Sequence, residues 1–378
     1  MYWTENPKND SATHAIVIIH GSLRDGDSYW TALNGIMQQQ LAWGNKNVDP
    51  NLIITAPEFY SKRFNSGLYQ PNQLAWGDTN LWQIGVPSIN PPNAKISSFA
   101  AAQALIEHFD NRTMYPKMKN VTLIGHSGGA QFVSRYASVM PTEPKHVSVR
   151  YVVADPSSSA YFTRDRPVTD PAYVDKDNCT LYANWRYGFN DFELAPYSGK
   201  TAKTYFSNYV SRDVVNLNGL LDTELNGDQQ CMALIQGGSQ RIGRNLAWWK
   251  YINLLARTDE DVSLFPGNFS STLPDWSGAY DGEFNVKLSI VANATHDVGE
   301  VFSSPQGCSA ILDDDNINLG WRPSEAFPIP PKNSTTPQAG SAGQDPSTSF
   351  SSSATAVQTS LLTITAAVLL AAVLVTMY

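Results

Sequence analysis

The stretch Val121-Thr-Leu-Ile-Gly-His-Ser-Gly-Gly129 decides the fold of this chain. Its first four residues are apolar or β-branched, and they lead directly into a Gly-x-Ser-x-Gly motif centred on Ser127. Residues 130–140 then show apolar side chains near helical spacing, and Pro141 ends that pattern. The sequence therefore predicts a buried strand that turns sharply into a helix, with Ser127 on the turn. Glycines are needed at both ends of the motif because side chains there would collide in so tight a turn.

The flanking elements decide how this motif is interpreted. A Gly-x-Ser-x-Gly string is a weak signal by itself in a chain with 25 glycines. A strand before it and a helix after it are the setting of a nucleophile elbow, which holds a serine hydroxyl clear of the sheet. The alternative is a glycine-rich turn whose serine only caps the following helix.

Composition limits the partners of the protein. The chain has 378 residues, of which 42% are hydrophobic, so it can bury a large core. A net charge of −8 argues against nucleic acid as a partner. Three cysteines without a Cys-x-x-Cys pair do not support zinc or thioredoxin-type chemistry. Residues 313–316 lack the spacing of a calcium loop, so we expect no metal and no organic cofactor.

Strands and helices alternate along the chain. Apolar runs predict buried strands at 15–19, 52–56, 149–154, 214–217 and 286–291. Helical patterns cover 97–109 and 240–255, and 61–96 is predicted to be loop-like. This alternation predicts an α/β fold, in which a mostly parallel central sheet is flanked by helices on both faces.

The position of the histidines suggests a base for the serine. A serine hydroxyl is a poor nucleophile unless a base takes its proton and an acid orients that base. Behind a nucleophile elbow these residues follow in the order Ser, Asp or Glu, His. Only His296 of the six histidines lies beyond the helix after Ser127 and the next strand. His296 is therefore predicted as the base, against the alternative of a surface-loop histidine.

The acid has more than one candidate. Asp222 follows the predicted strand 214–217 and is the preferred acid. Asp155 follows the preceding strand and is the alternative, because some hydrolases place the acid there. Two weaker candidates are Asp213 and Glu224.

An oxyanion hole needs two backbone donors directed at the developing negative charge. The first is predicted to be the N–H of Gly128, directly after the nucleophile. The second is predicted to be the N–H of Ser22 or Leu23, in the loop that His20-Gly21 introduces after the first strand.

Together these segments resemble the α/β-hydrolase superfamily. The resemblance covers about residues 14–312 and is closest to a secreted branch similar to esterases and polyhydroxyalkanoate depolymerases. The segments that carry it are His20–Asp25, Gly125–Gly129, Asp155–Ser158, Trp185–Gly188, the region of Asp222 and Cys231, and Thr295–Asp297. The resemblance implies an α/β-hydrolase fold with Ser127, Asp222 and His296 in the triad positions. It also implies one or two additional strands before Ala15.

The excursion 157–212 lies where such hydrolases often carry a cap over the site. Its aromatic residues Trp185 and Tyr187, together with His126 beside the nucleophile, are the candidates for substrate binding. The alternative for the aromatics is that they pack the excursion onto the body of the domain.

Cysteines and sequons give further expectations. In an oxidising compartment we expect a Cys231–Cys308 disulfide, which would tie the segment after the acid to the segment after the base. The alternative pairs Cys179 with Cys231. Seven Asn-x-Ser/Thr sequons lean mildly toward secretion. Besides the sequon at Asn9, they give the candidate glycosylation sites Asn111, Asn120, Asn178, Asn268, Asn293 and Asn333.

The function predicted from these features is a serine hydrolase that cleaves carboxylic esters through an acyl-enzyme. Amide or thioester hydrolysis at the same triad is one alternative, and a non-catalytic surface binding protein on a hydrolase scaffold is another.

The C-terminal part differs in composition from residues 1–325, the predicted catalytic domain. Residues 326–360 are rich in Ser, Thr and Pro and predict a flexible stalk, and 361–378 are almost wholly apolar. We expect a glycolipid anchor at the outer cell surface, attached after cleavage at one of the small residues that the stretch 349–354 supplies. The alternative is a tail anchor with the domain facing the cytosol. Residues 1–13 carry no signal sequence, so we expect the true N-terminus to lie further upstream.

Overall fold

The computed structural model describes residues 1–77, 80–141, 143–167, 179–269, 273–312 and 316–324. Its main sheet has seven strands in the order β1-β3-β2-β6-β7-β8-β9. They are β1 (Tyr2–Trp3), β2 (His14–Ile19), β3 (Ile53–Ala56), β6 (Asn120–His126), β7 (Ser148–Ala154), β8 (Asp213–Gly219) and β9 (Val286–Val291). β1 runs antiparallel to β3, and every other neighbouring pair is parallel. The predicted mostly parallel sheet is confirmed, and β1 is the additional strand that the resemblance implies.

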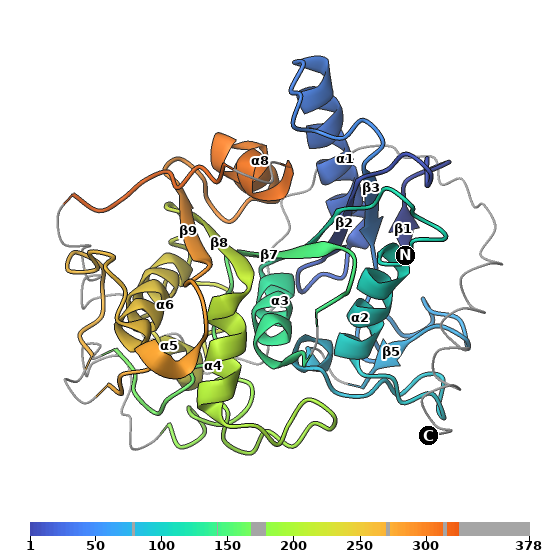
Figure 1. The fold of residues 1–378 in the computed structure, drawn as a ribbon. Helices are drawn as coiled ribbons and strands as arrows, with labels where there is room; N and C mark the ends of the chain where they lie inside the picture. The colour runs from blue at the N-terminus through green and yellow to red at the C-terminus, as the bar shows by residue number, and fades with distance from the viewer. Residues whose placement is uncertain (78–79, 142, 168–178, 270–272, 313–315, 325–378) are drawn as a thin grey trace. The chain divides into compact units, whose positions relative to one another are not determined.

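Helices cover both faces of this sheet because successive residues of each strand point to opposite sides. On β2, Ala15, Val17 and Ile19 pack into one hydrophobic cluster, whereas Ile16 and Ile18 pack into another. The first cluster includes side chains of α2 (Ser98–Phe109), α3 (Gly128–Val139), α4 (Ala202–Ser211) and α6 (Arg241–Ala256). The second includes side chains of α1 (Gly26–Ala42), α7 (Val298–Ser303) and α8 (Pro305–Leu312). Figure 1 shows α1 and α8 on one side of the sheet and α2, α3 and α4 on the other.

The region 61–96, predicted as loop-like, contains short regular elements. Strands β4 (Tyr60–Ser61) and β5 (Ala75–Trp76) pair in parallel, and a single 3-10 turn, η1, spans Leu81–Ile84. Two further short elements are α5 (Cys231–Leu234) and the 3-10 turn η2 (Ser277–Ala279). η1 packs beside α3, and this contact brings its residues next to the elbow.

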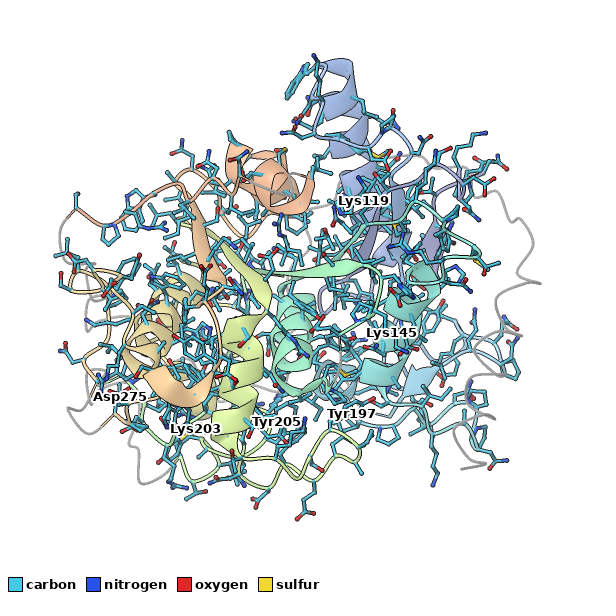
Figure 2. All side chains as sticks on the ribbon, viewed as in Figure 1. Lys119, Lys145, Tyr197, Lys203, Tyr205 and Asp275 are labelled. Atoms are coloured by element: carbon cyan, nitrogen blue, oxygen red, sulfur yellow. A yellow bond between two sulfur atoms is a disulfide. The ribbon has the colours of Figure 1, made fainter. Side chains whose placement is uncertain are left out.

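The excursion 157–212 is described except for residues 168–178. Its last part is α4, whose buried Phe206 and Tyr209 belong to the same hydrophobic cluster as α3. Within α4, the Tyr205 hydroxyl donates to the backbone oxygen of Tyr197 in the preceding segment at 2.9 Å, and Figure 2 labels both tyrosines. This end of the excursion therefore forms part of the layer that covers the sheet.

The predicted stalk 326–360 and the apolar segment 361–378 lie outside the described residues. Within the part of the chain that is described, none of the helices is both long enough and apolar enough to cross a bilayer.

Candidate active site

The turn between β6 and α3 holds Ser127 in a strained backbone conformation, with φ of 56° and ψ of −115°. Non-glycine residues rarely adopt a positive φ, and such strain is found where a functional side chain has to be presented. Added Cβ atoms at Gly125 and Gly129 would collide with the backbone oxygens of Gly129 and Ile19, respectively. The sequence predicted this strand–turn–helix geometry, and the structure confirms it.

Three strands deliver the predicted triad residues to one edge of the sheet. Ser127 follows β6, Asp222 follows β8 and His296 follows β9, and the carboxyl ends of parallel strands meet at the same edge. His296 Nδ1 donates to Asp222 Oδ2 at 3.0 Å, which leaves Nε2 of a neutral ring free to accept a proton. Among the described residues, the Ser127 hydroxyl makes no hydrogen bond to His296. Such a bond is often formed only once substrate is bound.

The Asp222 carboxylate is fully buried and has a second partner. Arg241, the first residue of α6, donates from Nη1 to Asp222 Oδ1 at 2.9 Å and from Nε to Ser157 Oγ at 3.1 Å. Burial alone would raise the pKa of Asp222, but the hydrogen bonds and charges of His296 and Arg241 outweigh it and lower this pKa. Asp222 is therefore ionised at neutral pH.

Asp155, the alternative acid, is also buried but has a different partner. Its Oδ1 accepts from the backbone N–H of Gly219 at 2.9 Å, and its Oδ2 lies 3.9 Å from His126 Nε2. Burial and the neighbouring Asp222 raise its pKa well above the usual value. The structure brings Asp222, rather than Asp155, into hydrogen-bond contact with His296. In the described part of the chain, neither Asp213 nor Glu224 contacts the ring of His296.

His126 lies beside the ring of His296, with the two centroids 4.5 Å apart. Its Nδ1 is hydrogen-bonded to the Tyr29 hydroxyl at 2.8 Å. Burial, together with the charges of His296 and Arg241, lowers the pKa of His126 well below 6.5, so the ring is neutral. Because only 3% of His126 is exposed, this geometry suits support of His296 better than contact with substrate.

His126, Asp155 and His296 also form the one group within the described ranges that could hold a metal ion. Each offers a ligand atom, and these atoms lie within 4.8 Å of one another. A metal bound there would occupy the base of the predicted triad.

The loop after β2 lies against the elbow, as an oxyanion hole requires. A Cβ added at Gly128 would stand 3.3 Å from the backbone nitrogen of Ser22, and one added at Gly21 would stand 3.7 Å from Ser127 Cβ. Leu23, the other predicted donor, follows directly and has a half-exposed side chain. The structure therefore places the Ser22 N–H beside Gly128.

His20 holds this loop in place. Its Nε2 accepts from the backbone N–H of Phe59 at 2.9 Å, so the neutral ring carries its proton on Nδ1 and donates it to the Gly21 oxygen at 2.8 Å. Burial lowers the pKa of His20 to about 4, which keeps this tautomer present at neutral pH.

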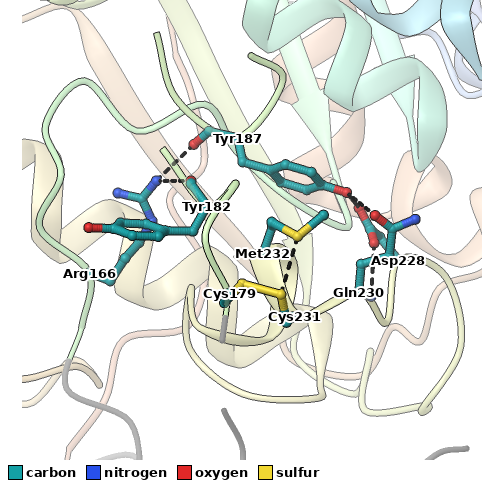
Figure 3. The surroundings of a disulfide bond; sticks show 8 residues. All are labelled: Arg166, Cys179, Tyr182, Tyr187, Asp228, Gln230, Cys231 and Met232. Atoms are coloured by element: carbon teal, nitrogen blue, oxygen red, sulfur yellow. Dashed lines mark hydrogen bonds between the residues drawn. A yellow bond between two sulfur atoms is a disulfide. The ribbon is translucent and has the colours of Figure 1, made fainter. Parts of the chain in front are cut away.

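The two aromatic candidates of the excursion are engaged in packing. Trp185 Nε1 donates to the Ile84 oxygen at 3.1 Å, and its ring centroid lies 4.1 Å from that of Phe192. The Tyr187 hydroxyl donates to Asp228 at 2.7 Å and contacts Gln230 (Figure 3). These contacts favour the packing alternative for both residues.

The preferred disulfide pairing is wrong. Cys231 pairs with Cys179, with their Cα atoms 5.9 Å apart, and Cys308 is a free thiol (Figure 3). Cys308 lies on α8, which covers the opposite face of the sheet from the helices next to Cys231, and its Sγ contacts the Phe302 oxygen at 3.6 Å. The alternative Cys179–Cys231 pairing is confirmed.

Sequon asparagines differ in exposure. Asn111, Asn268 and Asn293 are exposed, whereas Asn9 and Asn120 are half-buried. Two more lie outside the described residues, Asn178 and Asn333.

Two residues of the site, Arg241 and Gln83, escape sequence analysis. Arg241 is fully buried and neutralises Asp222, yet an arginine at the start of a helix gives no sequence signal of burial. Gln83 on η1 approaches Gly128, because a Cβ at that glycine would collide with Gln83 Nε2. Only the folded chain shows this approach, since 45 residues separate the two positions.

Comparison with solved structures shows the α/β-hydrolase fold. The poly(3-hydroxybutyrate) depolymerase LpqC from Bordetella parapertussis is 19% identical, with a TM-score of 0.51, over 82% of this chain and 85% of that one. The poly(aspartic acid) hydrolase-1 from Sphingomonas sp. KT-1 is 18% identical, with a TM-score of 0.50, over 79% of this chain and 88% of that one. No protein-family model and no curated protein sequence matches the chain.

Proposed function

We propose that this protein is a serine hydrolase that cleaves carboxylic esters through an acyl-enzyme intermediate. The observation that carries the proposal is the hydrogen bond between His296 and the buried Asp222, at the sheet edge where the elbow presents Ser127. An oriented histidine beside an elbow serine is the arrangement that activates a hydroxyl nucleophile.

In the first half of the reaction, Ser127 Oγ bonds to the ester carbonyl carbon while its proton passes to His296 Nε2. The carbonyl π electrons move onto the oxygen, and the N–H groups of Gly128 and Ser22 stabilise that charge. When the tetrahedral intermediate collapses, the bond to the alkoxide breaks, and His296 returns its proton to make the leaving alcohol.

In the second half, His296 takes a proton from water, and the resulting hydroxide adds to the acyl carbon. Collapse breaks the bond to Ser127, which regains a proton from His296 and releases the carboxylic acid. Asp222 stays ionised throughout, because Arg241 and His296 both stabilise its charge, and it keeps the His296 ring in the productive orientation.

Polymeric as well as small esters belong to the proposed substrate range, because both of the solved structures compared above are named for enzymes that degrade polymers. Amide hydrolysis is the second candidate activity. One of the two compared structures is named a poly(aspartic acid) hydrolase, and the same triad can attack an amide carbonyl.

The test is a panel of short-chain, long-chain and aromatic esters, run with matched amides. Wild-type protein should hydrolyse at least one ester faster than its amide, and Ser127→Ala should lower kcat by about 10⁴-fold or more. If Ser127→Ala retains wild-type rates, Ser127 is not the nucleophile. If no member of the panel is hydrolysed, the alternative of a non-catalytic binding protein is favoured.

The proposal extends to attachment of the mature enzyme to the outer cell surface through a glycolipid. The apolar segment 361–378 follows the stretch 349–354, in which every residue except Phe350 is small, and the Cys179–Cys231 disulfide suits an oxidising compartment. Phosphatidylinositol-specific phospholipase should release the enzyme from intact cells. Retention at the membrane, with a mature chain that still ends in Tyr378, would favour a tail anchor instead.

A further inference from the structure

The side chain of Gln83 approaches Gly128, the residue that follows the proposed nucleophile. The space beside the Gly128 Cα is bounded by Nε2 of Gln83, with which an added Cβ would collide, and by the backbone nitrogen of Ser22, 3.3 Å from that Cβ position. Gly128 itself supplies the backbone N–H directly after the nucleophile. Nε2 of Gln83 and the backbone nitrogen of Ser22 therefore both lie close to Gly128, the residue directly after the proposed nucleophile.

The Gln83 amide is not used by the protein itself. Only 3% of the residue is exposed, and its side chain makes no hydrogen bond to any residue in the described part of the chain, but its amide atoms are not among the polar atoms that are closed off from solvent without a partner. The accessible part of this amide is therefore available to a hydrogen-bond partner from outside the protein. An oxygen of a bound substrate would be such a partner.

Packing around η1 fixes the position of Gln83. The adjacent Trp82 is fully buried, and its ring stacks on Phe59 with centroids 5.4 Å apart and planes 13° apart. Backbone oxygens on both sides of Gln83 are also held, since Trp82 O accepts from Ser98 Oγ at 2.6 Å and Ile84 O from Trp185 Nε1 at 3.1 Å. A donor held in this way does not have to reorganise when charge develops.

We propose that Nε2 of Gln83 is a side-chain donor of the oxyanion hole, acting with the backbone N–H groups of Gly128 and Ser22. This inference rests on the proposed function. When Ser127 Oγ bonds to the carbonyl carbon, the π electron pair moves to the oxygen, and Gln83 donates a hydrogen bond to that oxygen without gaining or losing a proton. It stabilises the tetrahedral state more than the neutral substrate, so it acts on kcat.

The first variant to measure is Gln83→Met, which keeps the length of the side chain and removes the donor. We expect kcat to fall about 10²–10³-fold with little change in KM, as for loss of one oxyanion-hole donor. The melting temperature should stay near the wild-type value, because no hydrogen bond within the protein is lost. Gln83→Glu should be slower still at pH 8, because its carboxylate opposes the developing negative charge.

The matched control is Gln236→Met. Gln236 is also buried, but its amide accepts from the Ser159 N–H and donates to the Ser159 oxygen, both at 2.8 Å. This variant should lower the melting temperature and leave kcat within about threefold of wild type, the reverse of the Gln83→Met pattern.

Two kinds of failure can be distinguished. If wild-type protein hydrolyses no ester and Ser127 does not react with a fluorophosphonate, the proposed function fails, and this inference fails with it. If wild type is active but Gln83→Met keeps kcat within threefold, the role of Gln83 is wrong and the triad stands. The role of Gln83 would also be wrong if Gln83→Glu kept the wild-type kcat. It would be wrong as well if the fall in kcat of Gln83→Met were explained by a lower melting temperature of that variant.

Discussion

Arg241 Nη1 donates to Asp222 Oδ1 at 2.9 Å, and both side chains are fully buried. The other oxygen of the same carboxylate accepts from His296. One cation therefore compensates the buried charge of Asp222 and leaves the opposite oxygen available to orient the histidine. A triad acid that is fully buried needs this compensating charge, because burial alone favours its protonated form.

Replacing Arg241 by Met should leave Asp222 buried without a cation. We expect the free energy of unfolding to fall by about 3–5 kcal/mol, as when one partner of a buried ion pair is removed, and kcat to fall because the pKa of Asp222 rises. Urea unfolding and ester kinetics measure the two effects. Arg257→Met is the control, because Arg257 and Asp275 form an exposed pair at 3.8 Å and their loss should change stability by less than about 0.5 kcal/mol. Equal stability of the two variants would contradict this account of Arg241.

Lowering the pH should reduce the free energy of unfolding, because two histidines are buried in the folded protein. Burial lowers the pKa of both His14 and His20 to about 4, so between about pH 6.5 and 4 the unfolded chain binds more protons than the folded one. The stability that each contributes is fully present above pH 6.5 and is lost as the pH falls towards 4. It amounts to on the order of 3 kcal/mol per histidine.

Because the raised pKa of Asp155 acts in the opposite sense, the comparison should be made between wild type and His14→Gln. Urea unfolding at pH 7, 6 and 5 should show a shallower loss of stability in the variant. His14 contacts the Thr122 hydroxyl at 2.7 Å and is remote in sequence from the triad residues. An identical pH slope in both proteins would rule out titration of His14 as a cause.

The elbow should not tolerate a side chain at Gly129. An added Cβ would collide with the Ile19 oxygen, so we expect Gly129→Ala to lose at least about 2 kcal/mol of stability and most activity. Gly35, on the exposed side of α1, has no atom within 4 Å of its added Cβ. Gly35→Ala should therefore raise the free energy of unfolding by about 1 kcal/mol through helix propensity alone. Thermal unfolding separates the two cases, and a stable, active Gly129→Ala protein would disprove the tight turn.

The Cys179–Cys231 disulfide should contribute substantially to stability, because it closes a loop across a sequence separation of 52 residues. Its loss in the Cys179→Ala/Cys231→Ala double variant should cost about 4 kcal/mol by the chain-entropy estimate. Cys308→Ala serves as the single-thiol control and should be nearly neutral. Alkylation without reduction, followed by peptide mapping, should modify only Cys308. Modification of all three thiols would show that the bridge does not form in the isolated protein.

Much of the sheet and the order of the candidate site residues could be predicted from the sequence. The run 286–291 is a strand with those same bounds, because a buried parallel strand requires a continuous apolar segment. His296 could be chosen by elimination, since no other histidine follows β7. Gly125 is part of the elbow's own signal, because an added Cβ there would collide with the backbone oxygen of Gly129, four residues further on. Gly129 is required by a distant contact, with the backbone oxygen of Ile19.

Features that depend on distant contacts could not be predicted in this way. Helix α1 escaped prediction because Gly35 and several polar residues interrupt its apolar pattern, although Leu33, Ile36 and Met37 bury one side of it. The correct partner of Cys231 depends on which face of the sheet α8 covers. The spacing of residues in the sequence does not show which face a helix covers. It also does not show that Gln83 lies beside Gly128.

The central claim is that Ser127 is the nucleophile and that His296 and Asp222 activate it. The most direct measurement is the mass of the intact protein after reaction with a fluorophosphonate, followed by peptide mapping. Wild type should gain one phosphonyl group on Ser127, Ser127→Ala should gain none, and His296→Ala should react far more slowly. An unmodified wild-type protein, or equal labelling of Ser127→Ala, would contradict the account.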